Sequence, residues 1–293
     1  MQQPIIGINL PRTLSFEALD TALDTIKTNG FDAVEINIET FPLIIGGEIC
    51  RPWVDVLKAS LQKHDLSYSA HIGRGLDLRN LSNPQLHKRV LNASLDICAE
   101  LKLNPLVLHY EVQSQNQLAE KQFLEAHREA AKKAMQLGLT ICVENIEVEL
   151  VEPVVQLVET INHPNLRLNL DTGHAFLAAH YFHFDFLKAV ERMVPLLGHM
   201  HLNDNTGTFE ELRITNRPTY DGLSMNQRRE FGRGDIHLPP YFGTVPFKEV
   251  FARIPQSYHG KFICEYTSEA FGPLNAGIQQ EIRKKILESR KKA

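Results

Sequence analysis

Short apolar runs rich in β-branched residues recur along the chain, and most are followed by a longer amphipathic segment. Runs of this kind are typical of parallel strands that are covered on both faces. They predict eight strands, at residues 5–9, 33–37, 66–71, 106–109, 139–144, 166–171, 198–203 and 262–265.

Helices are predicted between and after these strands. The clearest begins at Asn83-Pro84, a cap followed by proline at the first helical position, and carries an apolar stripe of 3.6-residue period to Leu101. Ser15 is expected to cap a helix that runs toward Asn29-Gly30. Further helices are expected over 52–63, 117–137, 149–161, 186–196, 247–254 and 275–290.

Eight alternations of strand and helix predict an α/β protein, a (β/α)8 TIM barrel, with one domain over residues 1–293. No Pro- or Ser-rich linker divides the chain. One long irregular stretch, at about 204–244, follows the seventh strand, which places it at the expected mouth of the barrel.

Composition narrows the function classes. The 31 Lys and Arg and 35 Asp and Glu give a net charge of -4, so nucleic acid is not an expected partner. No apolar stretch approaches a membrane span of roughly 18 residues, and the first residues do not resemble a signal peptide, so we expect a cytoplasmic protein. Without a strand–G-x-G-x-x-G–helix unit or a Walker loop, no nucleotide cofactor is expected. A homo-oligomer is left open.

Metal-competent side chains lie at the ends of six consecutive predicted strands. In TIM barrels these ends meet at one face and carry the active site. Buried His and carboxylates gathered there would be costly without a counter-charge, so the pattern predicts a metal site. The residues are His71, His109, Glu144, Asp171 with His174 behind it, His201 and Glu265.

Among the other histidines, His199 shares a strand face with His201 but lies deeper, so it is expected to be a buried hydrogen-bonding residue rather than a ligand. His180, His183 and His237 lie in or near mouth-side loops and are expected to have no direct role.

Five motifs together connect the chain to a known family. They are VEN (143–145), LDTGHAF (170–176), HMHLNDN (199–205), GRGDI (232–236) and CE (264–265). Their order and strand placement resemble the xylose isomerase-like TIM-barrel superfamily of sugar (phosphate) isomerases and epimerases, which is related to the endonuclease IV branch of AP endonucleases.

The resemblance implies a function and its residues. Glu144, Asp171, His201 and Glu265 would bind one divalent metal ion, for which Mn, Mg, Co and Zn all suit the donor set. Glu144 and Glu265 would form an acid–base pair that isomerises or epimerises a sugar or sugar phosphate through a metal-stabilised enediolate. His174 would lie near a substrate oxygen.

The DNA-repair branch offers a comparison for the remaining ligands. His71 and His109 fall where that branch, with Glu144, holds another zinc, so a second metal is an option here. Its three-metal site also needs an Asp and a His from the loop after the seventh strand. Aligned on Gly232, Asn226 and Arg228 fall there, and neither completes such a site, which argues against phosphodiester cleavage.

Several alternatives stay open. The pair Arg228-Arg229 either binds a substrate phosphate or carboxylate or is an exposed loop pair. The function is either the metal-dependent isomerase or epimerase described above or one of three others: a polyol or keto-acid dehydratase of the same fold, an AP endonuclease-like phosphodiesterase, or a non-catalytic sugar-binding barrel.

Overall fold

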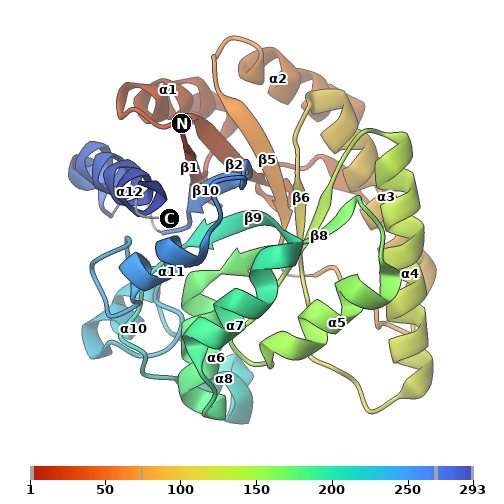
Figure 1. The fold of residues 1–293 in the computed structure, drawn as a ribbon. Helices are drawn as coiled ribbons and strands as arrows, with labels where there is room; N and C mark the ends of the chain where they lie inside the picture. Colours follow the sequence, from red (N-terminus) through yellow and green to blue (C-terminus); the bar gives the residue numbers. More distant parts are fainter. Residues whose placement is uncertain (1–2, 74, 267–269, 292–293) are drawn as a thin grey trace.

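Eight parallel strands close into a barrel in the computed structural model, which describes residues 3–73, 75–266 and 270–291 (Figure 1). The predicted (β/α)8 TIM barrel is confirmed, and each predicted strand is present with ends that shift by two residues at most. In barrel order the strands are β1 (Ile5–Asn9), β10 (Lys261–Cys264), β9 (Leu197–Leu202), β8 (Leu166–Asp171), β7 (Ile141–Glu144), β6 (Leu106–His109), β5 (Ser67–Ile72) and β2 (Ala33–Asn37).

Helices surround the barrel, and α12 packs beside β1, which brings the two ends of the described chain to one side (Figure 1). The outer helices are α1 (Phe16–Thr28), α2 (Arg51–Leu61), α3 (Pro84–Leu101), α4 (Gln117–Gln136), α5 (Val151–Ile161), α6 (Thr172–Phe182), α7 (Phe186–Met193), α11 (Phe247–Arg253) and α12 (Asn275–Arg290). Short 3₁₀ turns are η1 (Ile38–Thr40), η2 (Val194–Leu196) and η3 (Gly272–Leu274).

Besides the 3₁₀ turns and the short helices of the mouth loop, one helix and one hairpin were not predicted. Helix α6 is buried along its first two turns, so its apolar residues form no stripe that a 3.6-residue period could reveal. The hairpin of β3 (Ile44–Ile45) and β4 (Glu48–Ile49) turns at Gly46 and Gly47, whose φ angles are +62° and +87°. A Gly-Gly pair between apolar residues is a hairpin signal that the sequence does contain.

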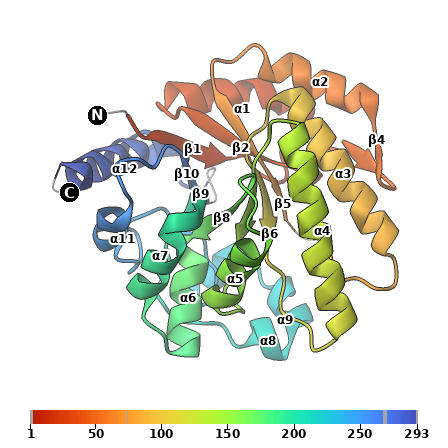
Figure 2. The ribbon, with the colours of Figure 1, turned by 45° about the vertical axis from the view of Figure 1, so that its right-hand side comes forward.

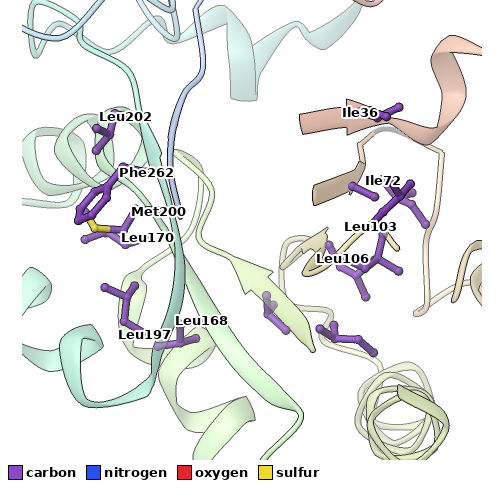
Figure 3. Close-up of a cluster of buried hydrophobic side chains, with 14 of the residues drawn as sticks. Ile36, Ile72, Leu103, Leu106, Leu168, Leu170, Leu197, Met200, Leu202 and Phe262 are labelled. Carbon is purple, nitrogen blue, oxygen red and sulfur yellow. The ribbon is translucent and has the colours of Figure 1, made fainter. Parts of the chain in front are cut away.

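The strands separate apolar from polar side chains. Leu168 and Leu170 of β8, with Met200 and Leu202 of β9, gather with Phe262 in the layer between the barrel and its helices (Figure 3). Because side chains alternate along a strand, the residues between them face the barrel interior, and these are polar. The barrel therefore has an apolar shell around a partly polar centre.

A register shift in β9 sharpens this separation. Leu168 pairs with Leu197, but the next residue, Asn169, pairs with His199, so Gly198 is an extra residue. A Cβ atom at Gly198 would lie only 2.9 Å from the Cys142 sulfur, which is why glycine fits there. The shift lets Leu197 join the apolar layer (Figure 3). His199 still faces the interior, where it lies 2.9 Å from a Glu35 oxygen.

The mouth loop at 204–244 is only partly irregular. It contains α8 (Leu212–Thr215), α9 (Arg217–Gly222) and α10 (Met225–Phe231), and the first two lie together at one end of the molecule (Figure 2). Ser224 and Gln227 form a capping box at the start of α10, and Gly232 ends it in the left-handed conformation. The Asp204 carboxylate accepts hydrogen bonds from the backbone of Gly243 and Val245, which closes the base of the loop.

No helix among the described residues is both long and apolar enough to span a membrane.

Candidate metal centre

Four side chains meet at the carboxyl ends of β7, β8, β9 and β10. Glu144, Asp171, His201 and Glu265 are buried, and each offers a ligand atom within 4.8 Å of the others. The Nδ1 atom of His201 lies 3.0 Å from a Glu144 oxygen, 3.1 Å from a Glu265 oxygen and 3.9 Å from an Asp171 oxygen. They are the four residues proposed from the sequence as ligands of one metal.

Strand register explains this meeting. Asp171 pairs with His201, and Glu144 pairs with Asn169, two residues before Asp171. The Asn169 amide donates to Glu144 Oε2 at 2.8 Å, and Asp171 accepts from the Asn203 amide at 2.6 Å. Neighbouring strands thus supply both the candidate ligands and the hydrogen bonds that orient them.

Glu35, on β2, lies beneath His201 and was not singled out in the sequence. One Glu35 oxygen lies 2.8 Å from His201 Nε2, while the other accepts from Ser69 Oγ and from His199 Nε2, each at 2.9 Å. A proton on His201 Nε2 is therefore drawn to Glu35, and the lone pair of Nδ1 faces the carboxylates of the centre. The sequence did contain a signal for Glu35, because a carboxylate between Val34 and Ile36 in a predicted buried strand needs a partner.

A second group shares Glu144. His71 Nε2 lies 3.4 Å from Glu144 Oε2, and His109 Nε2 lies 3.4 Å from Glu144 Oε1. The other nitrogen of His71, Nδ1, is 3.1 Å from the Asn37 side-chain oxygen, to which it donates. The structure thus brings together the histidines expected at a second metal or at the substrate.

A third group consists of His174, Asp235 and His237. Both histidines direct Nε2 toward Asp235 Oδ2, at 3.4 Å and 2.8 Å. Their Nδ1 atoms donate to backbone carbonyls, of Asn145 at 3.1 Å and of Glu265 at 2.7 Å. With Nδ1 engaged in this way, each Nε2 could give a lone pair to a cation that takes the place of its proton.

Two predictions concern the place of residues in this group. The loop Asp and His were expected to be replaced by Asn226 and Arg228, but Asn226 is exposed on α10 and the pair follows Gly232 instead, as Asp235 and His237. His237 was also expected to have no direct role, and it lies in this group. The spacing Asp-x-His was visible in the sequence; what placed it at the centre is the pairing of Asp204 with Leu238, one residue further on.

The electrostatics of the four-residue centre reflect crowded negative charge. Burial and the charges of Glu144 and Glu265 raise the pKa of Asp171 to about 7, against the opposing charge of His174. Burial opposes protonation of His201, but Glu35, Glu144 and Glu265 outweigh it and hold the pKa of His201 well above its usual range. The surroundings of the four residues thus favour positive charge.

The third group behaves in the same way. Burial opposes ionisation of Asp235, but the charges of His237 and His174 hold the pKa of that carboxyl well below its usual range. Burial disfavours the charged form of His237, yet Asp235 raises the pKa of His237 to about 9.

The donor set fits divalent cations. Five buried side-chain atoms of these groups form no hydrogen bond of good geometry: His71 Nε2, Glu144 Oε1, His201 Nδ1, Glu265 Oε2 and Asp235 Oδ1. Unsatisfied buried polar atoms are costly, and the first four of these face other candidate ligands, where a cation would satisfy them. Carboxylate oxygens with imidazole nitrogens suit Mn²⁺, Mg²⁺, Co²⁺ and Zn²⁺.

A cavity of about 660 Å³ opens onto this centre. Of the predicted anion-binding pair, Arg228 lines the cavity, while Arg229 donates to the carbonyls of Ile236 at 3.0 Å and His237 at 3.3 Å. The cavity's other lining residues include Asn9, Arg12, His109, Glu111, Glu147, His174, Arg213, Arg217, Tyr220, Asp235, His237, Glu265 and Tyr266. Its size is that of a small-molecule site.

Comparison with known proteins defines the family. Residues 23–288 match the xylose isomerase-like TIM barrel model, and the chain belongs to this family. No curated protein gives a significant match.

Several solved structures share the fold. A xylose isomerase-like TIM barrel protein from Mycobacterium smegmatis in complex with magnesium is 13% identical, with a TM-score of 0.71 over 99% of this chain and 98% of that one. A D-tagatose 3-epimerase-like protein is 18% identical, with a TM-score of 0.69 over 98% of this chain and 99% of that one. The 3-keto-D-glucoside 4-epimerase of E. coli is 15% identical, with a TM-score of 0.68 over 96% of this chain and 100% of that one.

Proposed function

We propose that this protein is a divalent-metal-dependent enzyme that isomerises or epimerises a carbohydrate. The observation that carries the proposal is the buried convergence of Glu144, Asp171, His201 and Glu265 beside a cavity of sugar size. Three carboxylates and one imidazole without a cation would leave excess negative charge in a desolvated place. The family and the epimerases among the similar structures support the same reaction class.

The four residues would hold one metal ion, which supplies a Lewis acid for the negative charge that develops on substrate oxygens. Glu265 lines the cavity and so can exchange a proton directly with a substrate carbon. Glu144 is fully buried, behind His109 and His174, whose rings line the cavity. The resemblance to the epimerases assigns Glu144 as the partner of Glu265 in an acid–base pair, one ionised while the other carries the proton.

Incubation with ketoses in deuterium oxide tests this directly. The metal-loaded chain is expected to exchange a carbon-bound hydrogen of its substrate, visible by NMR, and Glu265→Gln is expected to slow the exchange by about 10²–10⁴-fold. Glu111→Gln is the matched control, because Glu111 lines the same cavity but belongs to none of the ligand groups. Full exchange in both Glu144→Gln and Glu265→Gln would rule out the mechanism.

A second candidate, phosphoester hydrolysis, is favoured by the third ligand group. With His174, Asp235 and His237 present, the argument against a multi-metal site no longer holds. Glu144 also lies between two groups, as a bridging carboxylate does in multi-metal hydrolases.

Metal content and substrate separate the two candidates. The isomerase needs one metal ion per chain, whereas the hydrolase needs two or three and should cleave a duplex that contains an abasic site. Asp235→Asn is expected to abolish such cleavage but to leave the four-residue centre loaded. One metal per chain with no cleavage would exclude the hydrolase.

A further inference from the structure

Three arginines of the mouth loop line the cavity that holds the candidate ligands. They are Arg213, Arg217 and Arg228, from the successive short helices α8, α9 and α10. The sequence pointed only to the last of them, because the other two are separated from it by 11 residues or more.

Two of these arginines pack against the ring of Tyr220. Its ring is buried, with the guanidinium carbon of Arg228 at 4.4 Å from the ring centroid and that of Arg213 at 5.8 Å. Arg228 Nη1 donates to the Tyr220 hydroxyl at 3.1 Å. Guanidinium groups stacked on one buried ring lose little further freedom when they bind a ligand.

The charges of the three arginines are balanced differently. Arg213 pairs with Glu147, and Arg217 pairs with Asp221 at 2.8 Å. Arg228 is bound only by neutral oxygens, the Tyr220 hydroxyl and the Leu223 carbonyl, and no carboxylate of the described residues pairs with it. Within the described part of the chain, its positive charge therefore faces the cavity without a counter-ion.

The arginines adjoin the third ligand group. Burial and the charge of Asp235 raise the pKa of Tyr220 to about 12, so the phenol stays neutral. Asp235 also favours the charged form of Arg213, although burial opposes that form. The cavity thus has a cationic part next to its metal-ligating part.

We infer that the substrate carries a phosphate group, which Arg228 binds with Arg213 and Arg217 while the rest of the substrate reaches Glu265. Planar guanidinium donors match phosphate oxygens, and a charge without a carboxylate partner suits a dianion. A cavity of about 660 Å³ has room for a small phosphorylated molecule. That this molecule is a carbohydrate rests on the proposed function; the phosphate itself does not.

Titration calorimetry with inorganic phosphate tests the inference on the full chain loaded with Mg²⁺. Arg228→Met is expected to weaken phosphate binding about 10- to 100-fold, the effect of losing a charge-assisted hydrogen bond. The matched control is Arg233→Met, on the same loop, since Arg233 is exposed and does not line the cavity. Equal Mg²⁺ content in both variants shows that the ligand groups are intact.

A second variant covers loss of folding. Arg217 is 41% exposed, so Arg217→Met leaves the packing intact and is expected to weaken phosphate binding by a smaller factor. Equal phosphate affinity in Arg228→Met, Arg217→Met and Arg233→Met would overturn the inference. So would a dependence on Arg228 for glucuronate but not for phosphate, which would indicate a carboxylate subsite.

The two proposals fail separately. If no ketose exchanges hydrogen but phosphate binding still depends on Arg228, the proposed function is wrong and the phosphate subsite stands. If exchange occurs on unphosphorylated ketoses with full efficiency and phosphate neither binds nor inhibits, the subsite is wrong and the function stands.

Discussion

Two layers of buried polar residues lie in the barrel, and they are satisfied in different ways. In the inner layer, Glu35 receives hydrogen bonds from Ser69 and His199, so the protein itself compensates the carboxylate. In the mouth layer, Glu144 and Glu265 each retain a buried oxygen without a hydrogen bond, although ligand nitrogens surround them.

This difference indicates that a cation would bind in the mouth layer and not in the inner layer. A buried carboxylate is tolerated when donors surround it, and the inner layer meets that condition without any added group. The mouth layer does not, because its donors are imidazole nitrogens whose protons are committed elsewhere, as in His71 and His237. Only a cation or added protons can complete it.

The largest expected contrast is in metal affinity. His201→Gln removes one of four ligands and should weaken metal binding by roughly 10²–10³-fold, since a four-ligand site binds zinc with about 10–16 kcal/mol in all. His199→Gln, two residues away in the inner layer, should change affinity by less than tenfold. Equal loss in the two variants, measured by competition with a chelating dye, would erase the distinction between the layers.

A pH dependence of stability belongs to the inner layer. Burial lowers the pKa of His199 from 6.5 to about 4, despite Glu35. Because the unfolded chain takes up a proton near pH 6.5 and the folded chain does not, His199 lowers stability progressively as the pH falls from 6.5 toward 4, by roughly 3 kcal/mol at most.

Urea unfolding between pH 7.5 and 4.5, with a chelator present throughout, measures this effect. His199→Gln should flatten the pH profile relative to the wild type, since titration of the mouth layer is common to both. Profiles that stay parallel would show that the pKa of His199 is the same in the folded and unfolded chain.

A change in the inner layer should weaken metal binding in the mouth layer, but by less than the loss of a ligand does. Glu35→Gln leaves His201 without the carboxylate that orients it, and such supporting groups typically contribute 10–100-fold to metal affinity. Ser69→Ala, which removes only a neutral donor to Glu35, is the matched control and should have little effect. Glu35→Gln with unchanged affinity but reduced stability would make Glu35 a purely structural residue.

The smallest effect should be in the mouth loop. Ser224→Ala breaks the capping box of α10 and should cost about 1 kcal/mol, confined to the loop. Hydrogen exchange should then speed up in α10, which carries Arg228, but not in the strands that carry Glu35 and His199. Faster exchange in the strands would mean that loop and barrel unfold together.

Much of this molecule could be predicted from its sequence. The strands were found because parallel strands covered on both faces are continuous apolar runs, and the ends of six of them indicated ligands from His71 to Glu265. Helix α6 was missed because burial all around its first two turns removes the amphipathic stripe. The β3–β4 hairpin was missed because two-residue strands are too short for a periodic pattern.

The barrel and the mouth carboxylates could be read from the sequence alone, because both follow from local periodicity and from where the strands end. Only the tertiary structure decided that Glu35 supports His201 and that Asp235 and His237 join His174. Glu35 and His201 are far apart along the chain, and the loop position of Asp235 depends on its backbone pairing with β9's end. Contacts of this kind arise from barrel closure and loop packing, which no local pattern encodes.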